Sequence, residues 1–160
     1  MSVLQSSQLK SDDDGLDQGI LPELVGYSLR RAQLAIFADF AQATEAFELS
    51  PGQFGLLTLI EANPGITAAV LAREINLDKS SLTPLITRLE QRGLIERTLS
   101  PTDKRSRNIE MTRFGRGVLL KMTEAVRAHE DRLIQRLGKA DTQRLLALLR
   151  RTEEAFTERR

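Results

Sequence analysis

The densest group of side chains able to bind an anion lies in the second half of the chain, between Arg88 and Arg116. This stretch holds eight Lys and Arg residues against four acidic ones, a local balance of +4, although 23 basic and 22 acidic residues leave the whole chain at only +1. Guanidinium and ammonium groups form charge-assisted hydrogen bonds with phosphate oxygens. Residues 1–24 carry the opposite balance of −4, and a basic segment beside acidic ones is typical of a protein that presents one face to nucleic acid. On charge alone, a solvated surface fits equally well.

Three of these cations, Lys104, Arg105 and Arg107, stand in a polar turn at residues 100–107. The apolar and β-prone residues on either side, at 94–99 and 108–111, predict two short strands, so the turn is the tip of a hairpin. A basic hairpin that directly follows a helix pair is a wing, which can reach along the DNA backbone or into the minor groove.

The element that must position this wing is a pair of helices predicted at residues 68–75 and about 79–92, with a break at 76–78. Thr67 can cap the first helix and Asp78 the second, and Asn76 tolerates the left-handed backbone of a tight turn. Small and apolar side chains are expected to pack the two crossing helices together: Leu71, Ala72, Ile75, Leu77, Leu82 and Leu85. Such a helical hairpin without a DNA partner is the alternative, and the wing favours DNA binding.

Four further helices are predicted around this pair. The first runs from about Tyr27 to Phe47, and the second starts at Ser50 and Pro51 and ends at Asn63-Pro64-Gly65. Thr112 caps the fifth helix, Gly138 ends it, and Asp141 caps the sixth. Residues 1–19 are polar and predict a disordered tail.

The sixth helix carries more apolar surface than a lone terminal helix can leave in water. Its large apolar residues are Leu145, Leu146, Leu148, Leu149 and Phe156. We expect them to be buried across the two-fold axis of a homodimer, together with the first helix, with packing inside one chain as the alternative.

The expected fold class is therefore mainly α with a small β-hairpin wing: a winged helix-turn-helix with N- and C-terminal dimerisation helices. The expected domains are a tail at 1–19, a dimerisation helix at 20–48, a DNA-binding lobe at 49–112 and dimerisation helices at 113–160.

The composition argues against several other classes. The absence of cysteine excludes disulfides, thiolate metal sites and thiol redox sensors, and no apolar run is long enough to cross a bilayer. We therefore expect a cytoplasmic protein with no membrane contact. We find no glycine-rich phosphate loop, no nucleophile paired with a histidine and no converging metal ligands, so neither an enzyme, a cofactor nor a metal is expected.

Five short motifs follow one another between Leu49 and Gly117. They are LSPGQF at 49–54, LAR at 71–73, LEQRGLIER at 89–97, DKR at 103–105 and MTRFG at 111–115. Their order and spacing resemble the MarR (multiple antibiotic resistance regulator) family of winged-helix repressors. The resemblance implies a recognition helix in the major groove of a palindromic operator and a wing arginine, here Arg105, in the minor groove.

Carried onto this chain, the resemblance implies the following DNA contacts: Lys79, Ser80, Ser81, Thr83, Thr87, Arg88, Lys104, Arg105 and Arg107. Asp103 suits a salt bridge that holds the wing, because a carboxylate would repel phosphate. One departure is Pro84, which stands where family members often carry a basic residue and removes a helical hydrogen bond unless the helix begins later than Asp78.

The resemblance also implies an effector pocket between the DNA-reading lobe and the dimerisation helices. The stretch around Tyr27, Arg30 and Arg31 is similar to regulators of hydroxycinnamate and other aromatic-acid catabolism, and a phenol beside guanidinium groups suits an aromatic carboxylate or acyl thioester. The candidate ligand-binding residues are Tyr27, Arg30, Arg31, Leu34, Phe54 and His129. Ordinary packing and solvated charges are the alternative for Tyr27 and the arginines, and a hydrogen-bonded packing role is the alternative for His129, the only histidine.

These observations together predict a repressor that a small aromatic acid or aryl-coenzyme A (CoA) thioester releases from DNA. A helical protein-interaction dimer that never binds DNA is the alternative.

Overall fold

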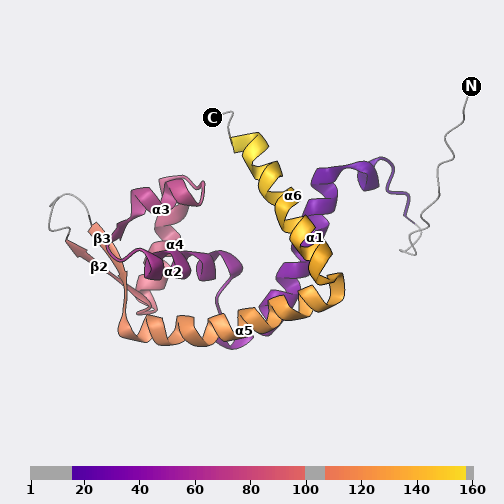
Figure 1. The fold of residues 1–160 in the computed structure, drawn as a ribbon. Helices are drawn as coiled ribbons and strands as arrows, with labels where there is room; N and C mark the ends of the chain where they lie inside the picture. The colour runs from indigo at the N-terminus through magenta and orange to yellow at the C-terminus, as the bar shows by residue number, and fades with distance from the viewer. Residues whose placement is uncertain (1–15, 100–106, 158–160) are drawn as a thin grey trace, which may run out of the picture. The chain divides into compact units, whose positions relative to one another are not determined.

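A computed structural model describes residues 16–99 and 107–157 of the chain. The chain divides into two compact units, residues 1–36 and 37–160, which are described separately. The division falls inside α1, the helix Val25–Ala43 (Figure 1). None of the described helices is long and apolar enough to cross a membrane.

In the first unit a 3-10 turn at Leu21–Glu23 precedes α1. The Tyr27 hydroxyl donates to Gln18 Oε1 at 3.4 Å, and the Arg31 guanidinium carbon lies 5.8 Å from the centre of the Tyr27 ring. Tyr27 is therefore a partly buried residue held by its own neighbours in sequence.

The first helix ends at Ala43, earlier than predicted, and a separate 3-10 turn follows at Glu45–Phe47. The buried Thr44 hydroxyl donates to the Phe40 carbonyl at 2.8 Å, and Glu48 adopts a left-handed backbone with φ +51°. Phe47 therefore belongs to a separate turn between α1 and α2 rather than to the first helix.

The helix α2 (Pro51–Ala62) starts as its sequence predicts. The Ser50 hydroxyl accepts from the Gln53 N–H, and the Gln53 side chain accepts from the Ser50 N–H, which forms a reciprocal capping box. The buried face of α2 carries Leu56, Leu57 and Ile60 into the core.

The predicted helix pair is confirmed as α3 (Ala68–Glu74) and α4 (Lys79–Gln91), capped by Thr67 and Asp78. Asn76 has φ +52°, the left-handed conformation expected at the turn. Leu77 was predicted to pack between the helices but is 39% exposed, because its position in the turn directs it away from the core formed by Leu71 and Leu82.

Pro84 does not shift the start of α4, which begins at Lys79 with the proline inside it. Because proline has no N–H, the Ser80 carbonyl loses its intrahelical partner. The helix persists because Leu82, Ile86 and Leu89 on its other face are fully buried.

The hairpin consists of β2 (Ile95–Leu99) and β3 (Arg107–Met111), antiparallel, with Arg97 opposite Ile109 and Leu99 opposite Arg107. A third strand, β1 (Ile66–Thr67), pairs with the other edge of β3 and was not predicted. Two residues are too few to show an alternating pattern, so only the tertiary fold reveals this strand.

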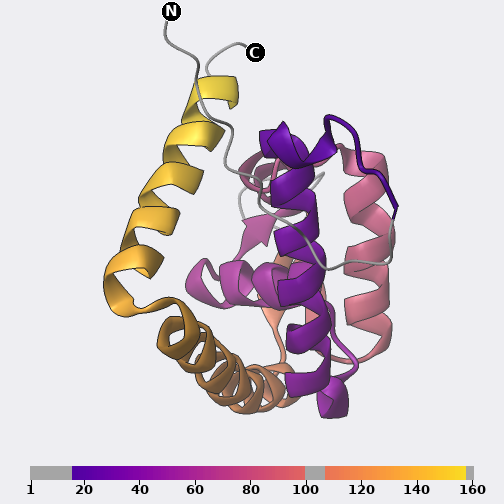
Figure 2. The same cartoon turned by 90° about the vertical axis from the view of Figure 1, so that its right-hand side faces the viewer.

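The helix α5 (Arg113–Leu137) begins at the Thr112 cap and is followed after Gly138 by α6 (Lys139–Thr157). Asp141 was predicted as the cap of α6 but lies within its first turn, because Gly138 at φ +85° lets the helix restart at once and its carbonyl accepts from the Thr142 N–H. Within the described chain α6 buries none of its residues, and Figure 2 shows it standing apart from the sheet and α4.

Candidate nucleic-acid interface and ligand pocket

The helix α4 presents a polar face to solvent opposite its buried leucine and isoleucine side. Six of the predicted DNA contacts lie on α4, and of these only Thr87 is half-buried; the exposed ones are Lys79, Ser80, Ser81, Thr83 and Arg88. An exposed polar helix face with cations at both ends suits the major groove of DNA.

The cap of α4 engages two of these residues. The Ser80 and Ser81 hydroxyls both donate to the Asp78 carboxylate, and the Ser81 N–H donates to the same group at 2.7 Å. The Ser80 hydroxyl is the main cause that lowers the pKa of Asp78 to about 2, followed by the Ser81 backbone and hydroxyl. Because both hydroxyl protons are already bonded to the Asp78 carboxylate, the Ser80 and Ser81 hydroxyls can only accept hydrogen bonds from a partner while these bonds persist.

Arg107, predicted as a wing contact, is exposed at the start of β3. It lines a hollow of about 330 Å³ between α3, α4 and the sheet, with Lys79 and Thr83 on α4 and Arg97 on β2. Three cations from three elements therefore gather around one concave surface.

Sequence reasoning missed the pairing of Arg97. Its guanidinium forms a salt bridge with Glu90 of α4, in which Nε and Nη2 both donate to Oε2. This hydrogen bond is the main cause that lowers the pKa of Glu90, and the charges of Arg97 and Arg107 lower it further. The Glu and Arg of the LEQRGLIER motif were visible in the sequence, but their contact depends on how α4 crosses β2.

The predicted contacts Lys104 and Arg105 and the predicted salt-bridge residue Asp103 lie outside the described residues. Their roles stay predictions.

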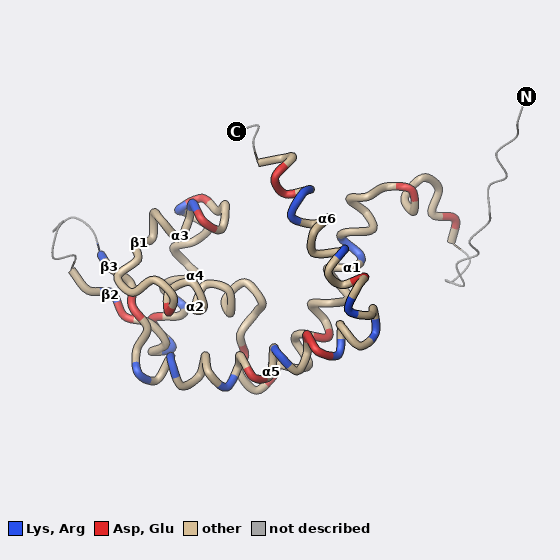
Figure 3. The backbone as a smooth tube through the Cα atoms, in the orientation of Figure 1, with Lys and Arg blue, Asp and Glu red and all other residues tan. Residues whose placement is uncertain are grey.

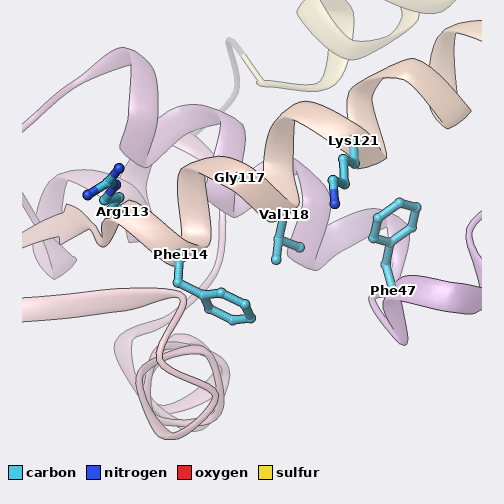
Figure 4. Close-up of a pocket in the computed structure, with 6 residues that line it drawn as sticks. All are labelled: Phe47, Arg113, Phe114, Gly117, Val118 and Lys121. Atoms are coloured by element: carbon cyan, nitrogen blue, oxygen red, sulfur yellow. The ribbon is translucent and has the colours of Figure 1, made fainter.

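A pocket of about 700 Å³ lies beside the N-terminal half of α5. Figure 4 shows Phe114, Val118 and Lys121 projecting from one side of α5, with the Phe47 ring near Lys121 and Arg113 at the opposite end. Phe114 is 63% exposed, which leaves an aromatic surface open between two cations. An apolar floor with cations at its ends suits an anionic ligand that carries an aromatic group.

None of the six predicted ligand-binding residues lines this pocket. Tyr27, Arg30, Arg31 and Leu34 belong to the first unit, whereas Phe54 and His129 belong to the second. Arg30 and Leu34 are exposed, and Arg30 donates to Gln33. Their ligand role stays a prediction. The isolated Phe47 and Phe114 gave no signal in sequence, because neither lies in a regular apolar pattern.

His129 is 2% exposed on α5, and its Nδ1 lies 2.7 Å from Asp39 Oδ2 on α1. The imidazole meets the Phe40 ring edge-on at 5.8 Å, and Phe40 in turn contacts Phe54 at 6.3 Å between ring centres. This environment favours the packing role, although Nε2 is buried with no hydrogen-bond partner among the described residues.

Comparison with known proteins places this arrangement in a family. The MarR family model matches residues 49–106. A protein from Thauera aromatica, assigned as the transcriptional regulator of the hcr operon, is 36% identical over 88% of this chain and 86% of its own. The chain belongs to the MarR family.

Two solved structures of one MarR-type repressor, CouR, are similar to this chain. CouR bound to a 23-mer DNA duplex is 38% identical with a TM-score of 0.83, and CouR bound to p-coumaroyl-CoA is 36% identical with the same score. Each covers 88% of this chain and 99% of its own. The predicted resemblance and winged-helix fold are confirmed, and the chain is a transcriptional regulator of a family whose members are not enzymes.

Proposed function

We propose that this MarR-family protein is a cytoplasmic homodimeric repressor that binds a palindromic operator and is released by an aromatic acid or its CoA thioester. The observation that carries the proposal is 36–38% identity, over nearly the whole of CouR, to structures of that repressor with DNA and with p-coumaroyl-CoA. The exposed polar face of α4 and the hollow lined by Lys79, Arg97 and Arg107 support the DNA part.

In this proposal α4 enters the major groove with Lys79, Ser80, Ser81, Thr83, Thr87 and Arg88, while Lys104, Arg105 and Arg107 serve the wing. The two recognition helices of a dimer must lie about 34 Å apart to read two half-sites. An effector lowers DNA affinity if it binds better to a conformation with another spacing.

The salt dependence of operator binding tests the DNA part. Each phosphate contact releases counterions and adds about 0.9 to the slope of log K against log salt. Lys79→Gln and Arg107→Gln should each reduce the slope by about that amount. Lys139→Gln on α6 is the matched control, and equal slopes for all three variants would contradict the proposed interface.

The pocket beside α5 supports the effector part, because Phe114 and Phe47 offer aromatic surface while Arg113 and Lys121 offer charge to an anion. p-Coumarate, p-coumaroyl-CoA and CoA alone should be titrated against the protein–operator complex. We expect the thioester to release DNA and CoA alone to have no effect. Indifference to all three would contradict an effector of this class.

Phe114→Ala tests the pocket itself. It should weaken the effector response about tenfold or more, since removal of a contacting aromatic ring forfeits 1–3 kcal/mol of binding. Leu120→Ala is the control, because Leu120 is 66% exposed on the same helix and does not line this pocket. Equal responses of the two variants would place the effector elsewhere.

A further inference from the structure

The Glu90–Arg97 salt bridge joins the C-terminal half of α4 to the first strand of the hairpin. Both side chains are partly buried, with 36% and 28% of their surface exposed. Two donors of the planar guanidinium meet one carboxylate oxygen, which restricts the orientation of both groups. The bridge therefore constrains the angle at which the hairpin leaves α4.

The register of the sheet places Arg97 and Arg107 on the same face. Arg97 lies opposite Ile109 and Arg107 lies opposite Leu99, so the two arginines are diagonal neighbours on adjacent strands. Side chains in this relation are about 7–8 Å apart and long ones interact. Two cations on one face of the sheet repel each other, and the positive charges of both arginines lower the pKa of Glu90.

Glu90 interacts with the two arginines in different ways. It forms hydrogen bonds with Arg97 but acts on Arg107 through charge alone. Arg97 is thereby neutralised, whereas Arg107 stays exposed and lines the hollow together with Lys79. Because Glu90 pairs with Arg97, Arg107 is available to contact a phosphate group.

We propose that Glu90 and Arg97 are positioning residues for DNA binding: their salt bridge holds β2 and β3 against α4 and keeps Arg107 directed at the DNA backbone. Neither residue contacts the DNA. The inference rests on the proposed phosphate contact of Arg107.

The test is a set of operator titrations at several salt concentrations with the full-length protein. The double variant Glu90→Gln/Arg97→Gln removes one charge of each sign, so its net charge equals that of the wild type. We expect operator affinity to fall about fivefold, the size of a partly buried ion pair, and the salt slope to fall by up to about 0.9, because Arg107 is no longer held at its phosphate. An affinity and a slope equal to those of the wild type would overturn the proposal.

The second measurement is the effect of Arg107→Gln in two backgrounds. In the wild type it should lower both affinity and slope, and in the double variant it should lower them much less, because Arg107 is no longer held in place. Full additivity would overturn the positioning claim while leaving the phosphate contact of Arg107 intact. No effect in either background would overturn both.

Two further variants separate positioning from general stability. The charge swap Glu90→Arg/Arg97→Glu should restore operator affinity toward the wild-type value, and a swap that binds no better than the double variant counts against the proposal. Glu61→Gln/Arg116→Gln removes a comparable bridge between α2 and α5, where Arg116 Nε lies 3.0 Å from Glu61 Oε2. In this control background, Arg107→Gln should lower operator affinity and salt slope as much as it does in the wild type. If its effect is instead reduced as much as in the Glu90→Gln/Arg97→Gln background, general destabilisation of the lobe explains the result.

Discussion

At the scale of single residues, Asp78 both caps α4 and engages two side chains that are proposed to contact DNA. Its carboxylate accepts from the Ser81 N–H as the cap of α4 and from the hydroxyls of Ser80 and Ser81. Both serines are proposed to meet DNA, so the cap also sets which way their hydroxyls point in the free protein.

The lowered pKa of Asp78 makes a pH-dependent prediction. Its folded value of about 2 lies below the ordinary 3.8, so the cap stabilises the fold fully above about pH 4 and loses this contribution as the pH falls toward 2. Thermal unfolding between pH 5 and 2 should show a smaller loss for Asp78→Asn, which cannot titrate but can still cap. Identical curves for variant and wild type would contradict the assignment.

Gly115 is the second residue whose type the structure explains. A Cβ at this position would lie 1.9 Å from the Leu94 carbonyl oxygen, a backbone atom that cannot move aside like a side chain. The Thr112 hydroxyl, which accepts from the Gly115 N–H at 2.9 Å and donates to the Gly93 carbonyl at 2.6 Å, holds the start of α5 in this close approach.

Gly115→Ala should therefore destabilise the protein by roughly 3 kcal/mol, at the upper end of overpacking effects. Gly55→Ala on α2 is the control, because nothing lies within 4 Å of its Cβ position, and it should stabilise by about 0.5–1 kcal/mol. Denaturant unfolding measures both changes, and a neutral Gly115→Ala would mean that α5 can shift away from Leu94.

At the scale of elements, α4 contains a local conflict. Its interior proline deprives the Ser80 carbonyl of a helical partner, yet the helix runs without a break from Lys79 to Gln91. Burial of Leu82, Ile86 and Leu89, each at most 1% exposed, outweighs this loss. Tertiary packing therefore keeps this segment helical although the helix propensity of Pro84 is low.

Pro84→Ala should then raise the free energy of unfolding by roughly 2 kcal/mol, because it restores the missing N–H at an exposed position of the helix. Urea unfolding followed by circular dichroism provides the measurement. If Pro84→Ala instead lowers the free energy of unfolding, the packing contacts of the pyrrolidine ring stabilise the protein by more than the restored helical hydrogen bond does.

Two contacts fix how the elements of the lobe join. Arg92, just after α4, donates to the Phe47 and Glu48 carbonyls at 2.8 Å, which holds the turn that carries one wall of the pocket. Arg116 on α5 pairs with Glu61 on α2. Figure 3 shows Lys and Arg along the whole of α5, with Asp and Glu among them only from its middle onward.

At the scale of the whole molecule, the sixth helix remains the main argument for an assembly. Leu145, Leu148 and Leu149 are 39–50% exposed and Phe156 is 74% exposed, and these positions share one helical face. The alternative, in which packing within one chain covers this face, finds no support in the described part of the second unit, where α6 buries none of its residues. A second copy is the partner that we propose.

Leu148→Glu should therefore convert a dimer to a monomer in sedimentation equilibrium and lower operator affinity, since a single lobe loses the second half-site. Arg150→Glu, on the opposite side of α6, is the control and should remain dimeric. A monomeric wild type would contradict the proposed assembly.

Local pattern alone determined a large part of this protein. The caps at Ser50, Thr67, Asp78 and Thr112, the left-handed Asn76 and the hairpin were all predicted, because each depends on residues within a few positions of one another. The five motifs likewise predicted the family correctly, since their order along the chain reflects a fixed order of elements.

Contacts between distant segments were decided only in three dimensions. The two-residue β1, the approach of Gly115 to Leu94, the Glu90–Arg97 bridge and the Phe47–Phe114 pocket each depend on how one element crosses another. A sequence carries periodicity and capping signals directly, but crossing angles follow from the packing of many side chains at once. For that reason the helices were found from the amino acids, whereas the surfaces between them had to be observed.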